Sequence, residues 1–191
     1  MDKNGNVIEM NKTTRGRLAL VGIALVFAIP LAAAFLLRSG GWEPQKTTQS
    51  GILVHPARNV ATVAVTLADG SQYAWQDPQY RWTLLALSGP DCAQDCQMRL
   101  DEALRMRITL GRNADRLRVL YVGASLPDGF VAARAPLQIG REDSNAFAFA
   151  RPTGVDQLAL ALVDPRGQLM LRYTDGYSAQ GLRRDITKII Y

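Results

Sequence analysis

The sequence predicts an α/β protein, with a central mixed sheet and flanking helices carried behind one N-terminal transmembrane helix. Residues 18–37 form an uncharged apolar run long enough to span a bilayer. Three further apolar runs, at residues 82–88, 117–123 and 158–163, are typical of buried strands. Helical apolar spacing lies between the first two, at residues 93–110. With 48% apolar and 20% charged residues, the 191-residue chain has a globular composition.

The run at residues 18–37, LALVGIALVFAIPLAAAFLL, predicts an uncleaved membrane anchor. A helix of this length extends about 30 Å, the thickness of the hydrocarbon core of a bilayer. Pro30 is tolerated in a membrane helix because neighbouring groups or local adjustments satisfy the freed carbonyl. Two alternatives stay open. One is a cleaved signal peptide, whose apolar region is usually shorter and ends at a small-residue cleavage site, and the other is a buried helix of a soluble domain.

The cations around this span predict its orientation. Four precede it and two follow it closely: Lys3, Lys12, Arg15 and Arg17 before, Arg38 and Lys46 after. Because cytoplasmic flanks carry the excess of Lys and Arg, we expect residues 1–17 to be a short cytoplasmic N-terminus. The C-terminal domain would then lie in the periplasm, anchored to a bacterial inner membrane.

Beyond the span we expect a linker at residues 38–58, which are polar and contain Gly and Pro, and a folded domain at residues 59–191. The domain begins with a β-branched strand at residues 60–67. The turn signal Ala68-Asp69-Gly70-Ser71 and the segment QYAWQ follow it, which predicts an N-terminal hairpin.

The central part of the domain reads as strand, helix, strand. The strand at residues 82–88 is followed by a helix over 93–110 and by a second buried strand at 117–123. The helix places four apolar residues on one face: Leu100, Ala103, Leu104 and Ile108. Such a unit implies a parallel strand pair with a right-handed crossover.

The last part of the domain is a hairpin followed by a helix. Residues 124–156 are irregular, with room for a short helix, and a buried strand follows at 158–163. The turn Asp164-Pro165-Arg166-Gly167 joins it to a partner strand at 168–173. A final helix begins near Ala179. This order is the layout of a thioredoxin-like domain, a central mixed sheet with helices on both faces.

The two cysteines, Cys92 and Cys96, are the candidate site. They fall between a buried strand and a helix start, where the helix dipole and unpaired N–H groups favour the thiolate. Cα atoms one helical turn apart lie about 6 Å from each other, so the two sulfurs can form a disulfide or bind one soft ion such as Cu(I). The carboxylates of Asp91 and Asp95 work against the formation of a thiolate, because a nearby negative charge disfavours a second anion. A structural disulfide and two inert thiols are the alternatives to a redox or metal function.

Composition excludes several other classes of protein. Two cysteines are too few for a disulfide-dense scaffold, and one histidine is too few for a His-rich zinc site. The net charge of +5 is not accompanied by a stripe of interleaved aromatic and basic residues, so we expect no nucleic-acid partner.

The segments WTLLALSGPDCAQDCQMRLDEAL, LRVLYVG and LALALVDPRGQL, together with the span, resemble the Sco family of membrane-anchored, thioredoxin-fold proteins. The resemblance implies a role in delivering copper to cytochrome c oxidase. It also implies that Cys92 and Cys96 are the redox pair and the Cu(I) ligands. The implied partner is an oxidase subunit or another assembly factor.

The chain departs from the Sco pattern at the family's distal histidine. That residue would fall near Val155-Asp156-Gln157, and Gln157 is the expected occupant. The third copper ligand is therefore unknown. Three other residues carry a side chain that can bind copper, but each is expected to be a surface or core residue: His55, Met98 and Met170.

Three functions remain open at this point. The first is an assembly factor for cytochrome c oxidase that handles Cu(I) or the thiol–disulfide state of a partner's copper site. The second is a general membrane-tethered thiol–disulfide oxidoreductase. The third is a redox-inert scaffold that docks on the oxidase complex. The only enzymatic activity among these functions is that of a thiol–disulfide oxidoreductase, and the resemblance favours the assembly factor.

Overall fold

The computed structural model describes residues 12–39, 49–134 and 136–190. The chain divides into two compact units, Met1–Thr47 and Thr48–Tyr191, each of which is described by itself. Residues 1–11 of the predicted cytoplasmic segment and residues 40–48 of the predicted linker, with Lys46, lie outside the described residues.

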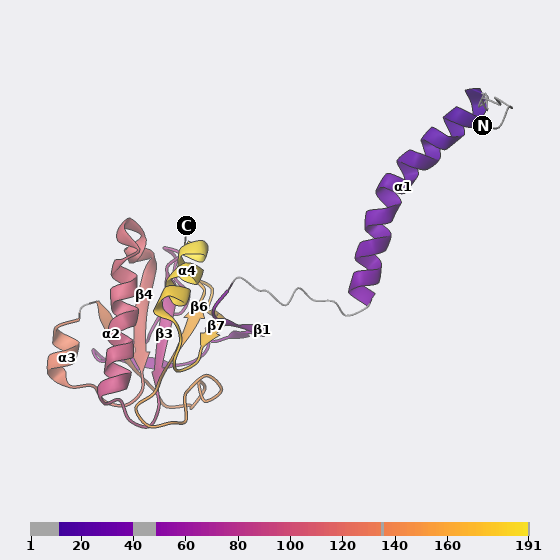
Figure 1. The fold of residues 1–191 in the computed structure, drawn as a ribbon. Coiled ribbons are helices and arrows are strands. Elements are labelled where there is room, and N and C mark those ends of the chain that lie inside the picture. The colour runs from indigo at the N-terminus through magenta and orange to yellow at the C-terminus, as the bar shows by residue number, and fades with distance from the viewer. Residues whose placement is uncertain (1–11, 40–48, 135, 191) are drawn as a thin grey trace, which may run out of the picture. The chain divides into compact units, whose positions relative to one another are not determined.

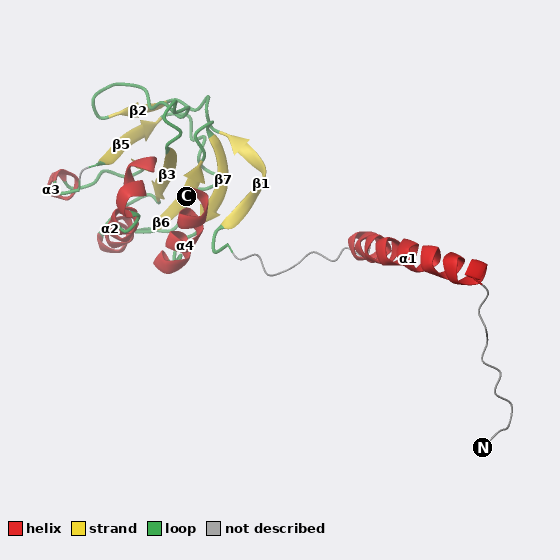
Figure 2. Ribbon diagram, turned by 90° about the horizontal axis from the view of Figure 1, so that it is seen from above, coloured by secondary structure: helices red, strands yellow, loops and turns green. Residues whose placement is uncertain are grey.

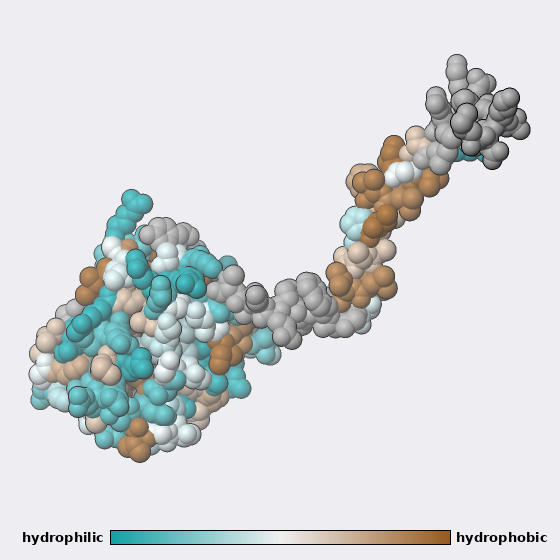
Figure 3. All heavy atoms as spheres, viewed as in Figure 1, coloured by the Kyte–Doolittle hydropathy of each residue, from teal (hydrophilic) through white to brown (hydrophobic). Residues whose placement is uncertain are grey.

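The first unit contains helix α1 (Lys12–Ser39), which includes the whole predicted span and carries Pro30 in its interior. Its apolar side chains are exposed in the structure, as the brown surface along this helix in Figure 3 shows. The segment Ala19–Leu37 is long and apolar enough to cross a membrane, a test that a signal sequence also passes.

In the second unit the described residues form one seven-stranded mixed sheet in the order β1-β7-β6-β3-β4-β5-β2 (Figure 1). The strands are β1 (Ile52–Asn59), β2 (Val65–Leu67), β3 (Trp82–Ser88), β4 (Leu117–Val122), β5 (Leu137–Glu142), β6 (Leu158–Val163) and β7 (Gln168–Tyr173). The helices are α2 (Gln94–Ile108), the 3-10 helix η1 (Gly111–Arg116), α3 (Asp128–Ala132) and α4 (Ala179–Ile190). The expected thioredoxin-like mixed sheet with helices is confirmed.

Strands β3 and β4 are parallel, and α2 is the crossover between them. On its other side β3 pairs antiparallel with β6, which continues into the hairpin with β7. The predicted strand–helix–strand unit and the C-terminal hairpin are therefore both present. Strands β3, β4 and β6 were predictable because both of their faces are buried, which produces continuous apolar runs.

The two faces of the sheet are covered differently, and the expectation of helices on both faces is wrong. Helices α2 and α4 pack on one face with Leu84 and Leu160 of the sheet, and Figure 2 shows the helices on this side. On the other face, Leu85 and Leu87 pack against irregular segments that supply Trp75 and Phe147. On this face, aromatic side chains from loops cover the sheet, where the prediction expected helices.

The edges of the sheet differ most from the sequence expectation. Strand β1 begins at Ile52, so the expected linker at residues 38–58 runs into the domain. The expected N-terminal strand at 60–67 is reduced to β2 (Val65–Leu67), and its hairpin to one bridge between Thr66 and Gln72. Strand β5 was not predicted. Strand β1 is mostly exposed and β5 is mostly half-buried, so neither shows a continuous apolar run or clean alternation.

Helix α2 confirms three of its four predicted core residues. Leu100, Ala103 and Leu104 are buried, whereas Ile108 is 70% exposed at the last turn of the helix. The neighbouring turn instead buries Met106. The apolar stripe therefore leaves the core before the helix ends.

This difference gives a paired test of the core. We expect Leu100→Ala to lower the free energy of unfolding by about 2–5 kcal/mol, because it leaves a cavity in a fully buried site. Ile108→Ala on the same helix should cost less than about 0.5 kcal/mol, since its side chain is exposed. Urea unfolding of the full-length chain in non-ionic detergent measures both. Equal costs would contradict the described packing of α2.

Candidate functional site

The site forms where β3 ends and α2 begins. Strand β3 runs to Ser88 at the edge of the buried sheet, and the segment Gly89–Ala93 leads into the helix. Antiparallel pairing places Leu158, the first residue of β6, opposite Ser88. The loop at residues 152–157, which precedes β6, is therefore brought to the same end of the sheet as the cysteines.

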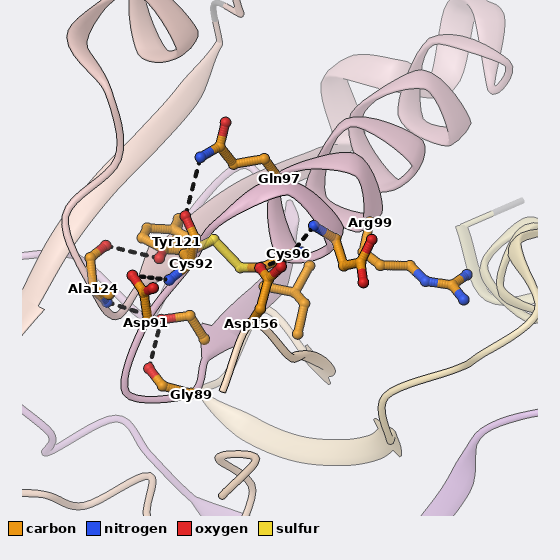
Figure 4. Close-up of a disulfide and its surroundings, with 12 residues drawn as sticks. Gly89, Asp91, Cys92, Cys96, Gln97, Arg99, Tyr121, Ala124 and Asp156 are labelled. Atoms are coloured by element: carbon orange, nitrogen blue, oxygen red, sulfur yellow. Dashed lines mark hydrogen bonds between the residues drawn. A yellow bond between two sulfur atoms is a disulfide. The ribbon is translucent and has the colours of Figure 1, made fainter. Parts of the chain in front are cut away.

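Cys92 and Cys96 form a disulfide across the first turn of α2 (Figure 4). Their Cα atoms are 5.0 Å apart, within the range that a disulfide requires. The side-chain amide of Gln97 donates a hydrogen bond to the Cys92 carbonyl (3.0 Å), and the Cys92 N–H donates to the Asp91 carboxylate (2.8 Å). The two sulfurs converge as expected, although Cys92 lies before the N-cap of α2 and only Cys96 lies on the helix.

The disulfide is almost closed to solvent. Cys92 is 3% exposed and Cys96 is fully buried, and both belong to the core cluster beneath α2. A sulfur must be reached by an attacking thiolate for exchange to begin. Of the two, only Cys92, which precedes α2, has any exposed surface.

The loop at residues 152–157 braces this segment from the side of β6. The Gly89 N–H donates to the Gln157 carbonyl (3.0 Å). The Asp156 carboxylate accepts two backbone N–H groups at the start of α2, from Asp95 (2.9 Å, Oδ2) and from Cys96 (2.9 Å, Oδ1). Figure 4 shows Asp156 beside Cys96 at the helix start. Asp156 therefore caps α2 from another part of the chain.

The two amides also fix the charge state of this carboxyl. Hydrogen bonds from the Cys96 and Asp95 N–H groups hold the pKa of Asp156 below its usual value of 3.8. A negative charge at a helix N-terminus is further favoured by the helix dipole. Asp156 adopts a left-handed backbone conformation (φ 57°), which Asp tolerates better than most residues and which turns its side chain toward α2.

Beneath the site, hydrogen bonds join the ends of β3 and β4. The Ser88 hydroxyl accepts the Ala124 N–H (2.8 Å), and the Tyr121 hydroxyl donates to the Ala124 carbonyl (2.8 Å). Burial raises the pKa of Tyr121, so its hydroxyl stays a donor at neutral pH. The Arg151 guanidinium donates to the Ser88 carbonyl (2.9 Å) and to the Val122 carbonyl (3.2 Å). The ends of β3 and β4, which lie beneath the disulfide, are therefore held together by several hydrogen bonds.

The residues weighed as further copper ligands do not gather around the cysteines. The side-chain oxygen of Gln157 accepts a hydrogen bond from the Gly154 N–H (3.1 Å) within its own loop. His55 lies in the edge strand β1, and Met170 lies in β7. Met98 is 51% exposed on α2. Within the described ranges there is no group of three His, Cys, Asp or Glu residues that could hold a metal ion.

Sequence reasoning missed the role of Asp156. It was considered only as a neighbour of the expected histidine position, yet it is the loop residue that reaches α2. Its two contacts are 61 and 60 residues away along the chain, so no local pattern could reveal them. The one available signal was the helix start itself, since Ala93 at the N-cap offers no side-chain acceptor.

The fold and the site together define a thioredoxin-like domain with a Cys-x3-Cys disulfide at a strand–helix junction. The model of one protein family, described as a transmembrane-like, thioredoxin-like, C-terminal domain, matches residues 82–190. The chain belongs to this family. None of the curated proteins matches the sequence.

Solved structures of Sco proteins share the fold at low sequence identity. BsSco, a member of the Sco family of cytochrome c oxidase assembly proteins, aligns with a TM-score of 0.52 and 13% identity, covering 73% of this chain and 96% of its own. Yeast Sco1 with copper bound aligns with a TM-score of 0.51 and 14% identity, covering 73% and 87%. A SCO1/SenC family lipoprotein from Bacillus anthracis aligns with a TM-score of 0.51 and 12% identity, covering 72% and 99%. The fold is therefore Sco-like.

The cap by Asp156 predicts how stability depends on pH. Because the pKa of Asp156 is lower in the folded chain than its usual value, its stabilisation is fully present above about pH 4 and is lost as the pH falls through the folded pKa. We expect Asp156→Asn to lower the thermal midpoint by a few degrees near neutral pH. The difference should shrink as the pH falls below about 4 and through the lower folded pKa of Asp156, because the carboxyl then becomes protonated and loses its charge.

Circular dichroism melts of the full-length chain in non-ionic detergent measure this difference. Thr153→Ala, in the same exposed loop, is the matched control because it changes no ionisable group. A deficit for Asp156→Asn that stays constant over this pH range would contradict the prediction.

Proposed function

We propose that this chain is a membrane-anchored, Sco-like assembly factor for cytochrome c oxidase. It would act through the Cys92–Cys96 pair on a partner, either an oxidase subunit or another assembly factor. The single observation that carries the proposal is the disulfide at the strand–helix junction of a Sco-like fold. The apolar helix α1 supports attachment to a membrane.

Thiol–disulfide exchange is the chemistry that this pair supports most directly. In the reduced chain the Cys92 thiolate attacks a disulfide of the partner, which forms a mixed disulfide and releases one partner thiol. The Cys96 thiolate then attacks the Cys92 sulfur, which releases the second partner thiol and restores the Cys92–Cys96 bond. The partner gains two electrons and two protons, and the chain loses them. A partner's copper-binding cysteines would thereby be reduced before they receive metal.

Cu(I) is the alternative cargo of the same two sulfurs. Two thiolates are a soft donor pair that suits Cu(I). The described residues add no third ligand near them, because Asp156 is bound to helix amides and Gln157 to its own loop. This donor set fits transient two-coordinate Cu(I) and does not fit a three-ligand Cu(II) site.

A redox-inert scaffold is the second candidate, and the burial of both cysteines favours it. In this second candidate, the disulfide between the 3% and 0% exposed cysteines serves to fix the start of α2. The chain would then use its fold to dock on the oxidase complex. The two candidates differ in whether the pair is reversibly reduced.

Copper and redox titrations of the full-length chain in non-ionic detergent separate these candidates. We expect the dithiothreitol-reduced chain to bind one Cu(I) in competition with a chelator, or to form a reversible dithiol–disulfide couple in a glutathione buffer. The double variant Cys92→Ala/Cys96→Ala should lose both properties. Met98→Leu is the matched control, since it removes the exposed sulfur nearest in sequence and should change neither.

The outcomes map onto the candidates. Binding of one Cu(I) that depends on the cysteines supports the assembly factor. A reversible couple without copper binding supports the general membrane-tethered thiol–disulfide oxidoreductase. If neither is found and the double variant still supports oxidase assembly in cells, the scaffold is correct and the proposed chemistry is wrong.

The proposed topology places the N-terminus in the cytoplasm and residues beyond α1 in the periplasm of a bacterial inner membrane. We expect alkaline phosphatase fused after Tyr191 to be active, because the enzyme matures only outside the cytoplasm. A fusion after Gly16, before the span, is the matched control and should be inactive. Mass spectrometry of the membrane-bound chain should find its N-terminus uncleaved. An inactive C-terminal fusion would contradict the proposed orientation and place the C-terminal unit in the cytoplasm.

A further inference from the structure

Asp156 occupies the position at which a thiolate of the pair would be stabilised. The first N–H groups of a helix have no partner within the helix, and at a cysteine-bearing N-terminus they stabilise the thiolate. In α2 two of these groups, on Asp95 and Cys96, already donate to the two oxygens of the Asp156 carboxylate at 2.9 Å each. The amides that could stabilise a thiolate at the start of α2 are therefore already bound to the Asp156 carboxylate.

The consequence for the sulfurs has two parts. A thiolate at Cys92 or Cys96 loses the two amides as hydrogen-bond donors, and it also faces a fixed negative charge at the same helix end. The oxidised pair carries no charge and is affected by neither. A group that disfavours the thiolate destabilises the reduced form relative to the disulfide.

The other charges near this helix end do not compensate. Asp91 and Asp95 add negative charge, and the Asp91 carboxylate accepts the Cys92 N–H. The nearest cation on α2, Arg99, is paired with Glu102 (3.2 Å) and lies over the Tyr177 ring. The positive end of the α2 dipole is therefore opposed by acids from two different segments.

We propose that Asp156 is a positioning residue that holds the Cys92–Cys96 pair in its disulfide form by occupying the amides of α2. This inference rests on the proposed thiol–disulfide function. It assigns the 152–157 loop the task of setting the redox preference of a pair that lies more than fifty residues away in sequence. Any event that lifts this loop, such as the docking of a partner, would return the amides to the thiolate and make the dithiol easier to form.

The test is the equilibrium with dithiothreitol, measured on the full-length chain in non-ionic detergent. One dithiothreitol dithiolate is oxidised to its cyclic disulfide while the Cys92–Cys96 bond accepts two electrons, and the two sulfurs take up protons according to their pKa values. Mass spectrometry after alkylation measures the reduced fraction. A pH titration of alkylation rate measures the apparent thiol pKa.

Asp156→Ala frees both amides and removes the charge. We expect it to raise the equilibrium constant for reduction roughly three- to tenfold and to lower the apparent thiol pKa, in proportion to the value of a charge at a helix N-terminus. Asp156→Asn keeps one acceptor oxygen where the carboxylate has two, so it should give a smaller change in the same direction. Circular dichroism checks that both variants stay folded. If Asp156→Ala does not fold, the conservative Asp156→Asn variant still provides the test.

Asp95→Asn is the matched control. It removes the same charge from the same helix turn and leaves the Asp156 contacts in place, because those contacts use the Asp95 backbone. We expect it to change the equilibrium less than Asp156→Ala does. An equal effect would overturn the assignment to Asp156 and leave only a general charge effect.

The remaining outcomes separate this inference from the proposed function. A reversible couple in the wild type that neither Asp156 variant shifts overturns the role of Asp156 alone. A wild-type disulfide that dithiothreitol cannot reduce without unfolding the chain overturns both the proposed exchange chemistry and the inference that depends on it.

Discussion

The antiparallel pairing of β3 with β6 is the constraint on which the rest of the structure depends. Its register places Ser88 opposite Leu158, so the segment that leaves β3 and the loop that enters β6 meet at one end of the sheet. The first segment carries the cysteines, and the second carries Asp156. Both strands are buried on both faces, so a shift of one residue would expose apolar side chains, and the register is strongly specified. The stability of the core thereby sets the geometry of the site.

The same packing that defines the site also limits access to it. The disulfide belongs to the core cluster that α2 forms with the sheet, and its closure protects the pair from indiscriminate thiols. Arg151 contributes by bridging the Ser88 and Val122 carbonyls beneath the site. In the proposed exchange, the short segment before α2, which has no regular secondary structure, would have to open locally. Such segments open at a lower free energy than the core.

Two electrostatic demands meet at the start of α2. The unpaired amides of a helix N-terminus need an acceptor, and Ala93 at the N-cap has no side-chain acceptor to offer. Asp156 meets this need from the neighbouring loop, which stabilises the helix and at the same time takes the amides away from a thiolate. The helix is thus stabilised at the expense of thiolate formation.

The sequence by itself determined the apolar helix α1, the buried strands β3, β4, β6 and β7, the helix α2, and the convergence of Cys92 and Cys96. Each of these follows from short-range rules: an apolar run, a helical period, or a four-residue spacing that returns to one helix face. Tertiary structure alone decided the rest. Strands β1 and β5 lie near the edges and carry no clear pattern, and one face of the sheet is covered by loop aromatics that have no helical signature. Asp156 reaches α2 only because strand register joins residues sixty positions apart, and no local rule encodes that distance.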